Sequence, residues 1–258
     1  MIDLAGIFTP ALIATWALAY LRVQTCLLMM PGWGERFVPA RLRVALAIAV
    51  TPLAAEMAGP APVPEQALDA EGVSILAFLA LIEALIGFVQ GLLVRFMALT
   101  LGMAASAIAA VTSLSQLVGG PSEAAPHPIG NLLDLAGIAL LMALGYPLFF
   151  ADYIAAGYQM LPTGRLPDAA LLGFAGVAAV SRAFGLAMTL ASPFILGGLL
   201  YQCLQGIVSR VMPTLPVVFI GAPAALLLAL IGIALLAIPI LAVWSGMMLD
   251  FQLPDLAP

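Results

Sequence analysis

The sequence predicts an all-α membrane protein built from about six to seven long, partly kinked apolar helices. Hydrophobic residues make up 64% of the 258 residues and charged residues only 8%, against about 45–50% and about 25% in ordinary soluble domains. Several long runs carry no charge at all, as membrane-spanning helices require. No stretch alternates polar and apolar residues with a period of two, so a transmembrane barrel is disfavoured. Helices are then the remaining way to satisfy backbone polar groups in lipid.

The expected helices follow the charge-poor runs and end at breaks rich in proline or glycine. Residues 96–122, 183–209 and 211–249 contain no charged side chain, and about 20 apolar residues suffice to cross a hydrocarbon core of about 30 Å. Two other runs are interrupted only by Glu83 and by Asp134. We expect helices at 4–30, 38–57, 72–94, 96–117, 129–160, 169–209 and 216–249.

Three prolines, Pro193, Pro223 and Pro239, fall inside apolar runs. In a membrane such prolines kink a helix rather than end it. The first apolar segment follows Asp3 and no cation, whereas a secretory signal begins with a basic region. We therefore expect this segment to be a retained helix that targets the chain to the membrane.

Arginine distribution suggests a topology. Residues 32–43 carry three of the eight basic residues, all of which are arginine, whereas the acidic loop 56–72 carries none. Short basic loops tend to remain cytoplasmic, so the first loop is expected inside and the second outside. If seven segments span the membrane, the N-terminus lies outside and the C-terminus inside.

The sequence offers no set of residues for catalysis or for a cofactor. His127 is the only histidine, and it stands between two prolines, so it cannot complete a usual zinc site. Cys26 and Cys203 lie in separate apolar runs, where we expect buried thiols acting as small hydrophobes rather than a disulfide or redox pair. Phosphate loops and dinucleotide fingerprints are lacking. A net charge of −5 gives no support for a nucleic-acid partner. We expect a protein that is not an enzyme and binds no cofactor or metal.

Charges within the apolar runs are the sharper signal, because an ionisable group at mid-bilayer costs about 2.5–3.5 kcal/mol. Each such charge forms an interhelical ion pair or lies near an interface, serves a proton or ion relay, or binds across a subunit interface. Glu83 and Arg95 are separated by about 18 Å along one helix, too far to pair with each other directly. The charges in question are Glu83, Arg95, Asp134, Asp152, Arg182 and Arg210.

Small residues indicate close helix packing. Gly87 and Gly91 form a Gly-x-x-x-Gly motif, which lets two helix backbones approach each other closely. The partner helix can belong to the same chain or to another subunit.

Two stretches of the sequence, "GERFVPARLRVALAIAVTPL" and "EALIGFVQGLLVRFMALTLGMAASAI", carry a resemblance to a known family. They resemble the flagellar and type III secretion export-gate proteins of the FliR (SctT) type. The first is similar to a family segment in which an arginine group opens an apolar helix, and the second to the family's Glu-x-x-x-Gly-x-x-x-Gly-x-x-x-Arg stretch. "HPIGNLLDLAGIALLMALG", "GYQMLPTG" and residues 184–228 continue the likeness in the same order. Other family features are replaced, for example by Pro216 in a turn where many relatives have asparagine. The chain thus resembles a divergent member.

The resemblance implies a non-enzymatic subunit of an export gate in the bacterial inner membrane, at the flagellar basal body. One copy would assemble with FliP-like, FliQ-like and FlhB-like subunits, surrounded by membrane lipid, into a pore for unfolded secreted proteins. Residues 1–168 would be FliP-like and residues 169–258 a FliQ-like helical hairpin. Within a central loop, 110–128, the counterparts of the family's pore-closing residues would be Ser113, Leu114, Gln116, Leu117, Gly119 and Gly120. Interface or packing positions would be Arg41, Arg43, Glu83, Gly87, Gly91, Arg95 and Arg210.

A rival hypothesis from the residues is a multi-pass transporter that works alone. It would use Glu83, Asp134 or Asp152 as intramembrane coupling sites, and an inverted repeat would favour it. A membrane-embedded enzyme is disfavoured because no nucleophile–base pair or metal set is present.

Overall fold

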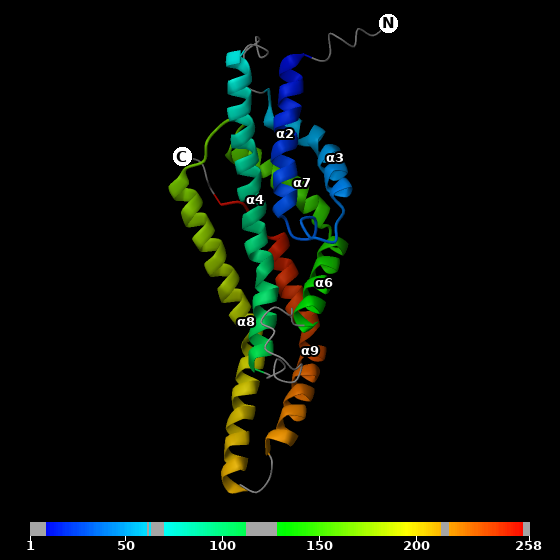
Figure 1. Cartoon of the computed structure of the whole chain (residues 1–258), viewed down its shortest axis with the longest axis vertical. Coiled ribbons are helices and arrows are strands. Elements are labelled where there is room, and N and C mark those ends of the chain that lie inside the picture. The colour runs from blue at the N-terminus through cyan, green and yellow to red at the C-terminus, as the bar shows by residue number, and fades with distance from the viewer. Residues whose placement is uncertain (1–8, 61, 63–69, 112–127, 213–216, 255–258) are drawn as a thin grey trace. The chain divides into compact units, whose positions relative to one another are not determined.

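The computed structural model describes residues 9–60, 62, 70–111, 128–212 and 217–254. Within those residues all regular structure is α-helical (Figure 1), so the predicted fold class is confirmed. The helices are α2 (Pro10–Met29), α3 (Ala40–Ala58), α4 (Ala70–Val111), α6 (Pro128–Ala143), α7 (Tyr146–Met160), α8 (Ala169–Val211) and α9 (Val217–Leu249).

Local sequence explains where several helices begin. The Thr9 hydroxyl accepts a hydrogen bond from the Leu12 amide at 3.3 Å, and Pro10 occupies the first position of α2. Both features favour a helix N-terminus. Pro39 precedes α3 directly. Gly145 precedes α7 with φ of 95°, a conformation that favours glycine.

Two expected boundaries are wrong. The predicted helices 72–94 and 96–117 are one continuous helix, α4, of 42 residues, which spans about 63 Å at 1.5 Å per residue. Arg95 does not interrupt it. Conversely, the predicted helix 129–160 is broken at Leu144–Gly145 into α6 and α7.

Four helices are long and apolar enough to cross a membrane, and a fifth span is possible if the broken α6–α7 pair counts as one. The seven spans on which the expected topology depended are therefore not found in the described residues. The four segments are Ala11–Met29, Gly72–Ile108, Ala169–Val211 and Pro223–Leu249.

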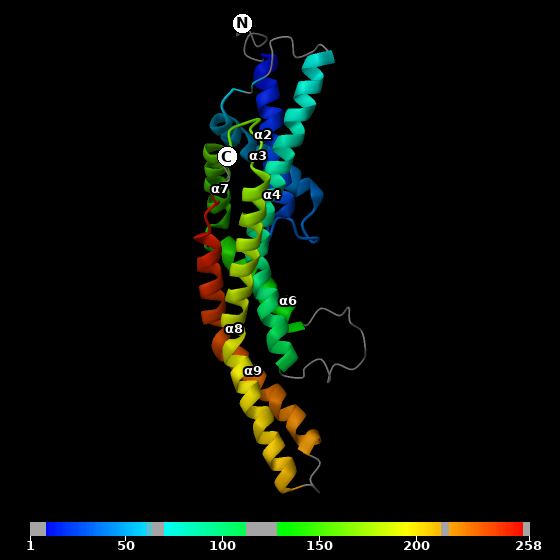
Figure 2. The same cartoon turned by 90° about the vertical axis from the view of Figure 1, so that its left-hand side faces the viewer.

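The chain divides into two compact units. Unit 1 contains α2, α3, α7, the part of α4 up to Phe96, the part of α8 up to Ala179, and the segment from Phe251 onward. Here α2 packs against α3, and α3 against α7, as both views show (Figures 1 and 2). Stacked aromatic rings of α7 continue onto Phe251, whose ring centroid lies 6.2 Å from that of Tyr153.

Unit 2 contains the remainder of α4, α6, the remainder of α8, and α9. α6 packs on α9 through Gly137, where an added Cβ would lie 2.9 Å from the Trp244 ring and 2.8 Å from a Leu101 methyl group. Between α8 and α9, the Tyr201 hydroxyl donates to the Gly221 carbonyl at 2.6 Å. The division of the chain at residue 168, drawn from the resemblance, stays a prediction.

α8 passes through Pro193 without ending. A proline cannot donate to the carbonyl four residues earlier, here that of Thr189, and the Ser192 hydroxyl donates to this carbonyl instead, at 2.8 Å. Of the two cysteines, Cys26 is buried as expected, whereas Cys203 is exposed on α8, so the expectation of a buried thiol is wrong there.

Candidate functional site

A buried ion pair joins α2 to α4 in unit 1. Arg22 donates from Nε to Glu83 Oε2 at 2.6 Å and from Nη2 to Glu83 Oε1 at 3.1 Å. Both side chains are fully buried. The two-pronged geometry matches the planar guanidinium to the carboxylate.

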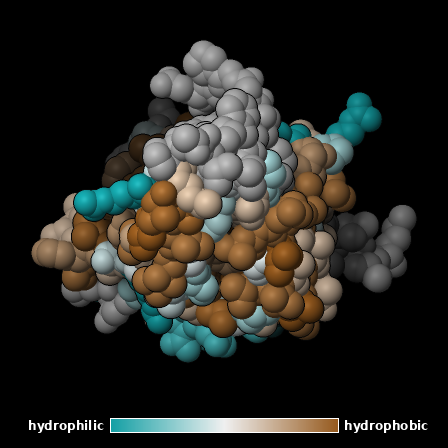
Figure 3. Space-filling view, turned by 90° about the horizontal axis from the view of Figure 1, so that it is seen from below, coloured by the Kyte–Doolittle hydropathy of each residue, from teal (hydrophilic) through white to brown (hydrophobic). Residues whose placement is uncertain are grey.

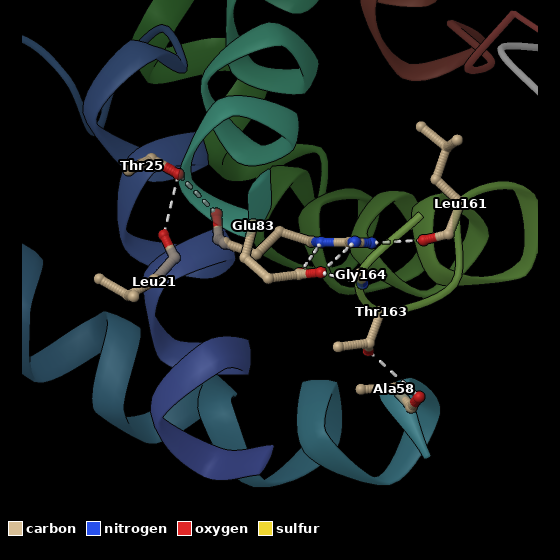
Figure 4. A network of polar contacts seen from close by, with 8 residues as sticks. Leu21, Thr25, Ala58, Glu83, Leu161, Thr163 and Gly164 are labelled. Carbon is tan, nitrogen blue, oxygen red and sulfur yellow. Dashed lines mark hydrogen bonds and ion pairs between the residues drawn. The ribbon is translucent and has the colours of Figure 1, made fainter. Parts of the chain in front are cut away.

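The same two side chains hold the connection between α7 and α8 (Figure 4). Arg22 Nη1 donates to the Leu161 carbonyl at 2.9 Å, and the Gly164 amide donates to Glu83 Oε1 at 3.0 Å. The guanidinium also lies 3.9 Å from the centre of the Tyr158 ring, a cation–π contact. Segments far apart in the sequence are thereby fastened together.

Further contacts extend this network to α3. The Thr163 hydroxyl donates to the Ala58 carbonyl at the end of α3, at 3.3 Å. Gly164 follows with φ of 79°, which favours glycine because it has no Cβ. A buried charge is tolerable only when it is paired and its remaining polar atoms are bonded, and Arg22 and Glu83 meet that condition. Together they hold α2, α4, α7 and the α7–α8 connection in one specific packing.

Gly87 and Gly91 lie where α4 meets α2. A Cβ added at Gly87 would overlap the Arg22 carbonyl oxygen and Thr25 Oγ1, and one added at Gly91 would overlap the Cys26 carbonyl oxygen. The Gly-x-x-x-Gly motif is thus used within the chain, next to Glu83 on the same helix. Close backbone approach is what brings the Arg22 and Glu83 side chains together.

A second ion pair fastens the loop before α3 to α4. Arg95 Nη1 lies 3.2 Å from Glu35 Oε1, and both side chains are partly exposed. Arg43, near the start of α3, donates to the carbonyls of Glu35 and Val38. Part of the charge cluster of residues 32–43 therefore stabilises the loop that contains it.

Other predicted positions lie apart from this network. Arg41 is exposed on α3 and Arg210 is exposed in the last turn of α8, and neither forms an ion pair with another described residue. Asp152 and Arg182 are also exposed. Asp134 of α6 is partly buried, with its carboxylate facing Gly102 of α4.

The residues expected to close a pore lie outside the described residues, since the structure describes nothing between 111 and 128. These are Ser113, Leu114, Gln116, Leu117, Gly119 and Gly120.

Glu83 was among the charges singled out in the sequence, and Arg22 was not. The two are 61 residues apart, so no local pattern pairs them. The available signal was a lone cation in one apolar segment and a lone anion in another, because lone charges in such segments need a partner.

The arrangement is suited to fastening helices rather than to chemistry. Within the described residues no three histidine, cysteine or acidic side chains come together as metal ligands. Glu83, the acid most deeply placed, already binds Arg22 and the Gly164 amide.

Comparison with known proteins agrees with this structural role. Residues 13–251 match the family model described as bacterial export proteins, family 1. The chain is 30% identical over 238 residues to the flagellar biosynthetic protein FliR of Caulobacter vibrioides, covering 89% of this chain and 90% of that protein. It is 27% identical over 236 residues to the flagellar biosynthetic protein FliR of Aquifex aeolicus, covering 89% and 87%.

The family match covers nearly the whole chain and identifies the family, and the long apolar helices identify the membrane as its location. The helices make this a multi-pass protein of the inner membrane. The chain belongs to family 1 of the bacterial export proteins.

Proposed function

We propose that the chain is a non-enzymatic subunit of the export gate of a flagellar or type III secretion apparatus, at the flagellar base. In this proposal it assembles with FliP-like, FliQ-like and FlhB-like subunits into a pore for unfolded proteins, and its loop 110–128 closes that pore. The observation that carries the proposal is the match to two FliR proteins over about nine-tenths of each chain. Membership of an export family also points to a structural component rather than an enzyme.

The exposed surface of α8 and α9 must be covered by lipid or by another protein. Hydrophobic residues make up much of the coloured surface in Figure 3, between hydrophilic patches. An extended apolar surface requires lipid or another protein to cover it. Many large apolar side chains of unit 2 are exposed, among them Phe184, Leu196, Leu200, Leu204, Ile207, Leu227, Leu235 and Ile238.

The stand-alone transporter finds less support. A coupling carboxylate must be able to lose its partner and take up a proton, and Glu83 is buried between Arg22 and the Gly164 amide. Asp152 lies exposed on α7, and Asp134 of α6 is partly buried with its carboxylate facing Gly102 of α4. No described arrangement favours this alternative over the export gate.

Purification in detergent, with and without co-expressed FliP-like and FliQ-like subunits, tests the proposal. We expect the tagged chain to be recovered in one stable complex with both subunits, and to be polydisperse when it is purified alone. A monodisperse monomer that is unaffected by the other subunits, and that moves a small solute across liposomes, would support the transporter instead.

A further inference from the structure

A hollow opens between the beginning of α2 and the end of α3 in unit 1. Its volume is about 440 Å³. Leu12 and Pro52 form apolar parts of its wall, and Trp16 and Glu56 also line it. None of these side chains belongs to the Arg22–Glu83 network.

The polar side of the hollow is negative. Glu56 is exposed, and it forms no ion pair with another described residue. It stands in the last turn of α3, which contains no basic residue. The C-terminal end of a helix carries a partial negative charge that favours a cation. A carboxylate and a helix terminus thus create negative potential at the same place, with no cation from the described chain.

The apolar side of the hollow fits the rest of a cationic side chain. Trp16 is 46% exposed, and tryptophan is the aromatic ring that attracts cations most strongly. Leu12 and Pro52 can cover the aliphatic stem, since lysine and arginine lay their methylene groups along apolar surface while the charged end remains polar.

We propose that this hollow binds a lysine or arginine side chain of a neighbouring polypeptide in the export assembly, with the cationic head between Glu56 and Trp16. The inference rests on the proposed function, because another gate subunit supplies the cation. A phospholipid ammonium group fits less well: its own phosphate lies beside it, and Glu56 and the end of α3 both repel that phosphate.

Site-specific photo-crosslinking tests the proposal in the complete assembly. The photoreactive residue p-benzoylphenylalanine replaces Ala11, which is exposed and lines the hollow, and the chain is purified with its FliP-like and FliQ-like subunits. After irradiation, mass spectrometry should map the crosslink to another subunit, next to a lysine or arginine. Glu56→Gln should lower the yield of this crosslink about threefold to fivefold, as loss of an exposed ion pair implies.

The matched control is Asp250→Asn, which removes an exposed carboxylate at the end of α9 and should leave the crosslink yield unchanged. Crosslinking to lipid, within the same chain, or to a segment without a basic residue would overturn the proposal, as would an unchanged yield with Glu56→Gln. If the assembly forms normally in those cases, the proposed function stands and only the cation site fails. If no assembly forms, both fail.

Discussion

At the scale of single residues, the fold depends on how its few buried charges are partnered. Arg22 and Glu83 together contact α2, α4, α7 and the α7–α8 connection. Removing one member leaves the other charged and buried, whereas removing both leaves only unbonded backbone groups at Leu161 and Gly164.

Arg22→Leu alone and Glu83→Leu alone should each lower the free energy of unfolding by about 3–5 kcal/mol. The double variant should recover part of that loss, because no unpaired buried charge remains. Thermal unfolding of the purified chain in detergent measures the cycle, and Arg182→Leu, at an exposed position of α8, is the control. Single variants as stable as the parent would contradict the importance of this pair.

Gly87→Ala should separate α2 from α4, because the new methyl group overlaps the Arg22 carbonyl oxygen and Thr25 Oγ1. Overpacking of this kind costs about 1–3 kcal/mol. The matched control is Gly206→Ala in α8, where an added Cβ meets no atom within 4 Å. That change should be neutral or stabilising by up to about 1 kcal/mol, because alanine favours helix. Equal effects of the two changes on the melting temperature would contradict the assigned helix contact.

The packing role of Gly87 could be suspected from spacing alone, but its partner could not. A Gly-x-x-x-Gly motif predicts close approach by some helix, from this chain or another. Which helix approaches is decided by tertiary structure, and the motif contains no information about it.

At the scale of elements, hydropathy placed the helices well and misjudged two of their breaks. Arg95 was read as a boundary because a charge is costly inside an apolar helix. Glu35 supplies a partner for it, so α4 continues. The break between α6 and α7 occurs inside an apolar run that contains Gly145 and Pro147, and these two residues were its only signal.

A deletion within residues 110–128 tests the pore-closing role in the proposed function. Deleting residues 113–120 should make the membrane permeable to ions or small molecules when the complete complex is expressed, because the segment proposed to close the pore is lost. Uptake of a membrane-impermeant dye by intact cells measures this. Unchanged permeability with normal assembly would count against a pore-closing role.

For the whole molecule, the sequence identified a membrane protein securely, but it did not show whether lipid or another protein covers each helix. A composition of 64% hydrophobic residues excludes a water-facing surface, but lipid and an apolar partner select the same side chains. Exposed residues such as Leu200 and Ile238 are therefore consistent with either covering. The order and spacing of weak motifs along the chain pointed to the export family, and the family match over residues 13–251 confirmed it.

The central claim is that this chain serves protein export as one part of a larger gate. Its most direct test is the amount of flagellar filament protein in the culture medium of bacteria that lack the chain. Secretion should be abolished in these bacteria and restored when the chain is supplied from a plasmid. Normal secretion without the chain would contradict it.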